Sequence, residues 1–168
     1  RDSYTIAQLK AINAATTGAI VLADASGALS GTVADIKDAF AGTVTTHTGT
    51  LEISDAGTTD ITATDITSIN TTNTGTITVT NTIDINGSGS EVEAAFAAID
   101  TNTGNATANI TGNNYTIAQL KAINAATTGA IVLADATAAL SGTVSDIKDA
   151  FAGTVTEHTG TLEITDAN

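Results

Sequence analysis

The sequence contains no cysteine, proline, methionine or tryptophan, and its 168 residues include only three phenylalanines and two tyrosines. Without cysteine the chain forms neither disulfides nor thiolate metal sites, an absence that suits an extracellular and a cytosolic protein equally. Without proline, no helix or strand loses a backbone hydrogen-bond donor. With so few aromatic side chains, the core must be built from alanine, isoleucine, leucine and valine, which favours thin stacked layers over one bulky centre.

Basic residues are scarce as well. Five lysines and arginines oppose eighteen aspartates and glutamates, which gives a formal net charge of −13. So acidic a surface repels phosphate backbones and anionic lipids, and we expect no nucleic-acid partner and no membrane insertion. The same charge attracts divalent cations and keeps a long polymer in solution. No apolar run reaches transmembrane length, and no signal peptide is recognisable.

The chain repeats itself. The phrase YTIAQLKAINAATTGAIVLADA begins at Tyr4 and again at Tyr115, and residues 4–56 match residues 115–167 at 48 of 53 positions. The middle of the chain aligns with both, because "TATDITSINTTNTGTITV" from Thr62 follows the same pattern as "TIAQLKAINAATTGAIVL". We therefore expect one domain over residues 1–168, made of three long repeats, 4–60, 61–114 and 115–168. Each long repeat contains two coils, where a coil is one unit of helix, turn, strand and turn.

Six capping signatures subdivide the long repeats. In each, a serine or threonine is followed three residues later by Gln, Asp or Glu, the pattern in which two side chains satisfy free amides at a helix start. The pairs lie 26 to 30 residues apart: Thr5/Gln8, Thr32/Asp35, Thr62/Asp65, Ser88/Glu91, Thr116/Gln119 and Thr143/Asp146. Apolar residues at helical spacing follow each cap, which predicts six short helices of roughly ten residues.

Alternating apolar residues beyond each helix predict a strand. The inward-facing candidates are Ile20/Leu22, Leu51/Ile53, Ile77/Val79 and Ala108/Ile110. Helix, turn, strand and turn recurring every 26 to 30 residues predict an α/β solenoid of about six coils with a parallel β-sheet. Such a stack exposes unpaired strand edges and open core at both ends, so we expect further repeats or head-to-tail stacking of copies.

The strand ends carry acidic or amide side chains that form the candidate metal site. Aligned coils place them in one row, with Gly112 in the fourth coil: Asp24, Asp55, Asn81, Asp135 and Asp166. Carboxylates stacked about 5 Å apart repel one another unless they are neutralised. Hydrogen bonds to turn amides are one solution, and a calcium ion held by oxygen ligands is the other.

Three further stretches have both a functional and a structural interpretation. Residues 84–91, "DINGSGSE", resemble a loose calcium loop but also align with a turn and helix cap. The alternating threonines from Thr74 to Thr82 suit an ice-binding array or simply an exposed strand. His47 and His158 lie four coils apart, about 20 Å along a stack, so they cannot share a zinc ion, and we interpret both as turn residues.

The repeats resemble modules of very long secreted and cell-surface proteins of cyanobacteria and other aquatic bacteria. Some of those are described as haemolysin-type calcium-binding or adhesin-like proteins. The resemblance rests on "TIAQLKAINAATTGAIVLADA…ALSGT", covers nearly all of residues 4–168, and is weakest in 58–114. It implies an extracellular structural or adhesive role and no catalytic residue. The glycine- and aspartate-rich GGxGxD nonapeptide of such calcium-binding proteins is absent from this chain.

Together these patterns predict a structural repeat module of an extracellular filament, surface layer or giant adhesin, stacking head to tail. A calcium-dependent adhesion module is the alternative, and an ice-binding module a more distant one. No phosphate-binding loop, nucleophile elbow or Cys/His pair is present, so we expect no enzyme activity. We expect no required cofactor, with Ca²⁺ as the one possible ion.

Overall fold

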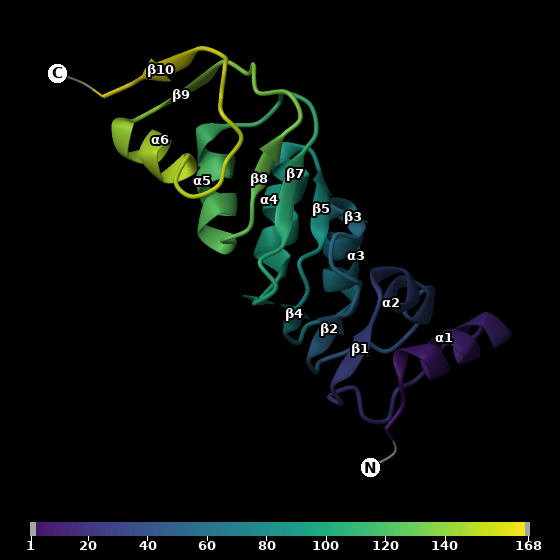
Figure 1. The fold of residues 1–168 in the computed structure, drawn as a ribbon. Coiled ribbons are helices and arrows are strands. Elements are labelled where there is room, and N and C mark those ends of the chain that lie inside the picture. The colour runs from purple at the N-terminus through teal and green to yellow at the C-terminus, as the bar shows by residue number, and fades with distance from the viewer. Residues whose placement is uncertain (1–2, 167–168) are drawn as a thin grey trace.

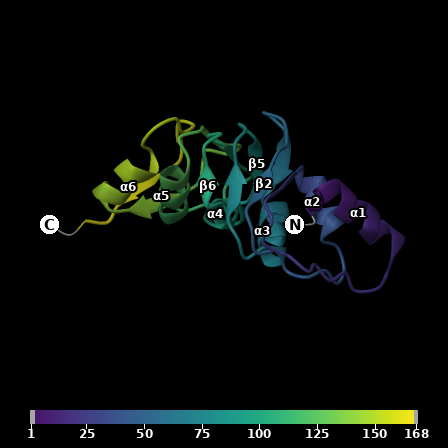
Figure 2. The ribbon, with the colours of Figure 1, turned by 90° about the horizontal axis from the view of Figure 1, so that it is seen from below.

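The computed structural model describes residues 3–166, so the last two residues of the third predicted repeat lie outside the described residues. Over this range the chain is a mixed α/β protein whose six helices and ten strands follow one another along an elongated molecule (Figure 1). Each helix contacts the next, and the helices form a row along the long axis (Figure 2). The helices are α1 (Ile6–Ala15), α2 (Val33–Ala39), α3 (Ala63–Thr72), α4 (Gly89–Ala98), α5 (Ile117–Ala126) and α6 (Val144–Ala150).

Every helix begins at a predicted cap residue. The reciprocal capping box forms at Thr5, Ser88 and Thr116, each of which has Gln or Glu at the third helical position. Thr32 and Thr143 are followed by Asp, and their hydroxyl oxygens accept the Asp35 and Asp146 amides. Only Thr62 starts its helix without a side-chain cap hydrogen bond. The prediction of all six helix starts is therefore confirmed. The reciprocal pair of hydrogen bonds expected at each start forms at only three of them.

All strand pairs in the described residues are parallel, as predicted, but they form three sheets instead of one. The sheet orders are β1-β2-β4-β6, β3-β5-β7-β8 and β9-β10. The strands are β1 (Leu29–Gly31), β2 (Leu51–Ile53), β3 (Asp60–Thr62), β4 (Ile77–Val79), β5 (Asp84–Gly87), β6 (Thr101–Asn102), β7 (Thr107–Ile110), β8 (Ile131–Leu133), β9 (Leu140–Gly142) and β10 (Leu162–Ile164).

The single sheet was wrong because most coils contain two strand-forming segments. One follows the helix, and in the second, third and fifth coils another lies directly before the next helix, where the sequence had indicated only a turn. In the fourth coil β6 follows the helix, and β7 is the strand predicted at Ala108 and Ile110. Residues 84–87 of the predicted turn or calcium loop are strand β5, although the cap at Ser88 is correct. Strand β2 pairs with β1, which precedes a helix, and with β4, which follows one. Pairing thus changes between the two kinds of segment along the molecule.

Small aliphatic side chains fill the space between helices and strands, as the composition requires. The predicted inward residues Leu51, Ile53, Ile77 and Val79 are fully buried. Ile20 and Leu22 are half-buried, and Ile20 forms only an isolated bridge with Val44. The remaining fully buried large side chains come from the first five coils: Leu9, Ile36, Ile66, Ile69, Ile83, Ile85, Ile110, Leu120 and Ile123.

Equivalent residues of the first and third repeats differ in burial according to what covers them. Leu51 is 0% exposed beneath the coil of α3, whereas its copy Leu162 is 41% exposed at the end of the array. Conversely, Ile12 of α1 is 51% exposed, while its copy Ile123, which follows the coil of α4, is 0% exposed. Because the local sequences match, the neighbouring coil alone accounts for the difference.

This difference predicts unequal costs for one substitution at two matched positions. Leu51→Ala should lower the free energy of unfolding by about 2–5 kcal/mol, because it leaves a cavity between two coils. Leu162→Ala should lower it by less than about 1 kcal/mol, because much of that side chain is already in water. Urea denaturation at low protein concentration measures both, and equal losses would show that the burial pattern is wrong.

The caps offer a second matched pair. Thr32→Ala should cost about 1 kcal/mol, because the amide of Asp35 loses its hydroxyl acceptor. Thr62→Ala should cost clearly less, because the Thr62 side chain caps no helix amide. Comparison of the two urea midpoints measures this difference. Loss of stability at Thr62 as large as that at Thr32 would contradict the cap assignment.

Candidate functional site

Two of the predicted metal ligands cap the helix that begins their own coil. The Asp55 carboxylate is buried, and its Oδ2 accepts the amide of Val33, the first residue of α2, at 2.8 Å. Asp166 accepts the amide of Val144, the first residue of α6, at 2.7 Å. A negative charge at a helix N-terminus is stabilised by the free amides there. Each of these strand ends is therefore tied to the start of the helix in its own coil.

Of the other three ligand candidates, Asp24 and Asp135 hold turns, and Asn81 bonds to another coil. Asp24 Oδ1 accepts the amide and hydroxyl of Ser26 at 2.9 and 2.6 Å, and Asp135 does the same for Thr137. The Thr137 hydroxyl, and then its amide, lower the pKa of Asp135 below its ordinary value. Asn81 Nδ2 donates to the Asp55 carbonyl oxygen at 2.7 Å. The turn interpretation is thus confirmed for Asp24 and Asp135.

The structure does not bring the five candidates together around one point. Within residues 3–166, no group of three or more His, Asp or Glu side chains is placed to hold a metal ion. Hydrogen bonds within the protein occupy all five side chains instead. Calcium binding at these positions therefore stays a prediction.

His47 joins three successive coils. It is 0% exposed, and its Nε2 lies 2.7 Å from the Gly27 carbonyl oxygen of the coil before it. Its Nδ1 lies 2.8 Å from Asn73 Oδ1 of the coil after it. The turn interpretation missed this role, because only the tertiary structure shows that the turn is covered on both sides. His158 keeps the first contact, with Nε2 at 2.8 Å from the Ala138 carbonyl oxygen.

The threonines of the predicted ice-binding stretch continue onto one neighbouring strand but not onto the other. Thr78 lies in β4, between Glu52 of β2 and Thr101 of β6. The Thr80 hydroxyl donates to Glu52 Oε1 at 2.9 Å. The row is therefore interrupted by a carboxylate, as the aligned sequences indicated.

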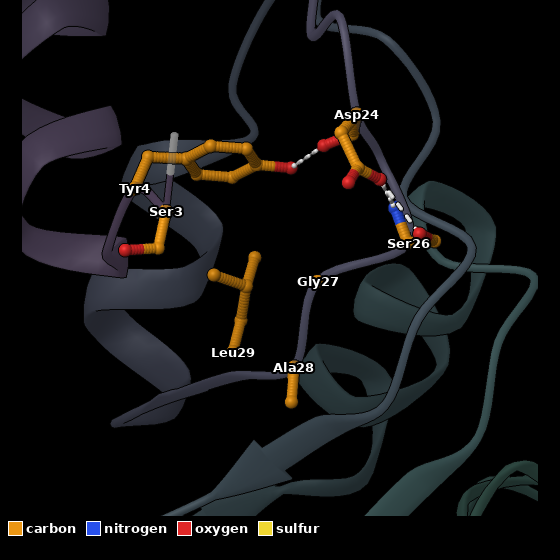
Figure 3. Close-up of a pocket in the computed structure, with 7 residues that line it drawn as sticks. All are labelled: Ser3, Tyr4, Asp24, Ser26, Gly27, Ala28 and Leu29. Atoms are coloured by element: carbon orange, nitrogen blue, oxygen red, sulfur yellow. Dashed lines mark hydrogen bonds between the residues drawn. The ribbon is translucent and has the colours of Figure 1, made fainter. Parts of the chain in front are cut away.

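A pocket opens at the end of the molecule that carries α1 (Figure 3). Tyr4 lies across it and donates its hydroxyl to the Asp24 carbonyl oxygen at 3.0 Å, with Leu29 beneath. In the third repeat the equivalent Tyr115 makes the same hydrogen bond at 2.9 Å but is only 3% exposed, because Gly89 of α4 packs against it. The pocket therefore lies at an end of the molecule where no further coil covers Tyr4. The equivalent position at Tyr115 is closed by the coil of α4.

The opposite end has a matching apolar surface. Phe151, His158 and Leu162 line an open hollow there. Their copies in the first repeat, Phe40, His47 and Leu51, are 6%, 0% and 0% exposed. We call this surface the C-terminal face, made of Val144, Ile147, Phe151, Leu162 and Ile164. The N-terminal face is made of Tyr4, Ile12, Gly18, Ile20 and Leu22.

Ion pairs connect successive helices along the exposed side of the row. Lys10 of α1 binds Asp35 and Asp38 of α2 at 2.7 and 2.8 Å, and Lys121 binds Asp146 and Asp149 of α6 in the same way. Lys37 of α2 pairs with Asp65 of α3. Hydrogen bonds from Lys10, and then from Thr32, lower the pKa of Asp35. These pairs are solvent-exposed, so each contributes little alone.

Comparison with known proteins provides no relative. No family model matches the chain, and neither a curated protein nor a solved structure matches it. Among the described residues, no helix is both long and apolar enough to cross a membrane. The two end faces are therefore the candidate functional surfaces that the structure itself provides.

The ion pairs predict a specific response to acid. The pKa of Asp35 lies below its ordinary value of 3.8 in the folded chain, so the unfolded chain binds the proton first as the pH falls. The stabilisation by Lys10 should be complete above about pH 4 and should disappear as the pH falls below it. Lys10→Met should therefore destabilise the protein more at pH 7 than at pH 2.5, as measured by urea denaturation.

Lys148→Met is the matched control for this experiment. Lys148 belongs to the exposed end, and no ion pair involves it within residues 3–166. Its substitution should have a pH-independent effect. A Lys10→Met loss that stayed constant from pH 7 to 2.5 would contradict the ion-pair interpretation.

Proposed function

We propose that the chain is a structural repeat module: a solenoid of six coils that stacks head to tail in an extracellular filament, surface layer or giant adhesin. One observation carries the proposal. The residues exposed at each end of the molecule are copies of residues that another coil covers inside it, as with Leu162 and Leu51. An open end of this kind is completed by a further coil.

The contacts between coils suit a load-bearing role. Parallel backbone hydrogen bonds, a shared aliphatic core and lysine–aspartate pairs all connect one coil to the next along the same axis. A pulling force along that axis would be distributed over many contacts. We propose no enzymatic activity, since the buried Asp55 carboxylate caps the helix of its own coil and the buried His47 contacts the coils on both sides.

The acidic composition supports an exposed, polymeric setting. A net charge of −13 keeps long threads soluble and makes unscreened copies repel one another. Dissolved salt or divalent cations reduce this repulsion, which is how calcium could promote assembly without a dedicated site. The resemblance to repeats of secreted surface proteins adds support for the extracellular location.

Negative-stain electron microscopy tests the proposal directly. We expect the purified chain to form uniform unbranched threads at high concentration in about 0.15 M salt, where the charge repulsion is screened. Imaging in calcium and in EDTA separates the alternatives. Threads in both buffers support the structural module, and threads lost only in EDTA support the calcium-dependent alternative. Separate short particles under every condition would overturn head-to-tail assembly.

A further inference from the structure

We infer that the C-terminal face binds the N-terminal face of a second copy of this chain, with β10 pairing in parallel with residues 20–22 of that copy. The inference rests on the proposed head-to-tail assembly and specifies the contact between the two faces, which we call the joint. The chain contains two internal junctions of the same kind, where α3 follows α2 and α5 follows α4. In both, the second coil of one long repeat packs against the first coil of the next long repeat. The proposed joint would bring together the same two kinds of coil.

The strand register at the two internal junctions agrees. At the first, Leu51 of β2 pairs with Ile77 and Ile53 with Val79. At the second, Ala108 of β7 pairs with Ile131 and Ile110 with Leu133.

Sequence alignment transfers this register to the joint. Leu162 and Ile164 are the copies of Leu51 and Ile53, and Ile20 and Leu22 are the copies of Ile131 and Leu133. Leu162 should therefore pair with Ile20 of the second copy, and Ile164 with its Leu22. Among residues 3–166 of the single chain, β10 pairs only with β9 and Ile20 bridges only Val44, so both strands have an open edge there.

A turn glycine supplies the second line of evidence. A Cβ on Gly75 would lie 2.0 Å from the Gly49 carbonyl oxygen, and one on Gly129 would lie 2.4 Å from that of Asn105. These glycines let one coil rest directly on the backbone of the coil before it. Gly18 is their copy in the first coil, yet a Cβ there meets only the Thr16 hydroxyl, at 3.3 Å. At the joint, Gly18 should rest on Gly160, the copy of Gly49.

The apolar side chains complete the match. Ile12 is 51% exposed, whereas its copies Ile69 and Ile123 are 1% and 0% exposed at the two junctions. On the opposite face, Val144 is 47% exposed and its copy Val33 is 4% exposed. Association would thus bury on each face the side chains that the internal junctions bury.

The joint should have the spacing of the first junction. Gly89 approaches Tyr115 so closely that a Cβ on it would lie 2.7 Å from the Tyr115 Cβ. Val144 stands where Gly89 does, so it cannot come as close to Tyr4. At the first junction the position of Val144 is held by its copy Val33, and the position of Tyr4 by Ile61. The first junction therefore predicts the spacing of the joint better than the second does.

The joint also lacks one ion pair that the first junction has. Lys37 pairs with Asp65 there, whereas the copies of these two residues are Lys148 and Gln8. The contact between copies should therefore be weaker than the contact within the chain.

Two blocked variants test which faces meet. Gly18→Ala should weaken self-association at least about tenfold, because the methyl group meets backbone of the other copy. Ile164→Asp should weaken it at least about 100-fold, because a charge is buried without a partner. Both sites are open in the single chain, so thermal unfolding of the monomer should change little. Gly57→Ala is the control, since a Cβ there has ordinary room, 3.6 Å from the Thr82 carbonyl oxygen.

Mixing the two variants gives the decisive result in sedimentation velocity. Each variant alone should be monomeric, and their equimolar mixture should form dimers that grow no further, because each variant supplies the face that is blocked in the other. Should Gly18→Ala associate like wild type, or should the mixture stay monomeric while wild type forms threads, the joint is wrong but the proposed assembly stands. Wild-type chain that stays monomeric at every concentration overturns both.

Cross-linking tests the register. The chain has no native cysteine, so Val21→Cys with Glu163→Cys can be joined by a short bismaleimide without background. Their copies Thr78 and Glu52 are paired neighbours at the first junction. The control pair is Val132→Cys with Glu163→Cys, because the strand of Val132 already has neighbours on both sides. A ladder of oligomers with Val21 and none with Val132 supports the register, and equal ladders overturn it.

Discussion

Hydrogen bonding between the backbones of consecutive coils is the constraint on which this structure depends. No described helix exceeds ten residues and no described strand exceeds four, so none of these elements would persist alone in water. Each coil becomes stable only when a neighbour pairs with its strands and covers its aliphatic side. Repetition is therefore a physical requirement of such short elements, and it leaves two incomplete ends.

Polar side chains between the coils limit how one coil can lie on the next. Asn81 donates to the Asp55 carbonyl oxygen of the coil before it, and His47 contacts the coils on both sides of its own. Within residues 3–166, no buried side-chain nitrogen or oxygen lacks a hydrogen-bond partner. A shift of one coil by a single residue would break these bonds and leave buried polar groups unpaired, which is costly. The polar contacts therefore specify register, while the aliphatic core supplies most of the stabilisation.

Much of the local structure could be predicted, because it depends on residues close together in the sequence. A cap and the apolar spacing after it lie within about one helical turn or two, and all six helix starts followed from them. The sheets could not be predicted in the same way. Segments such as 84–87 lack clear alternation and become strands only because a neighbouring coil offers its backbone. The sequence left two interpretations of the aspartate row open: the structure gives Asp24 and Asp55 backbone amide partners, and calcium binding there stays a prediction.

By itself, the sequence determined that the chain is built from repeated coils, where each helix starts, and which aliphatic residues form the core. These properties follow from local periodicity and from composition. Only the tertiary structure decided which strand pairs with which, that His47 is buried, and that Leu51 and Leu162 differ in exposure although they occupy equivalent positions. The physical reason is that burial depends on the coil that covers a residue, and two copies of the same sequence do not have the same neighbour.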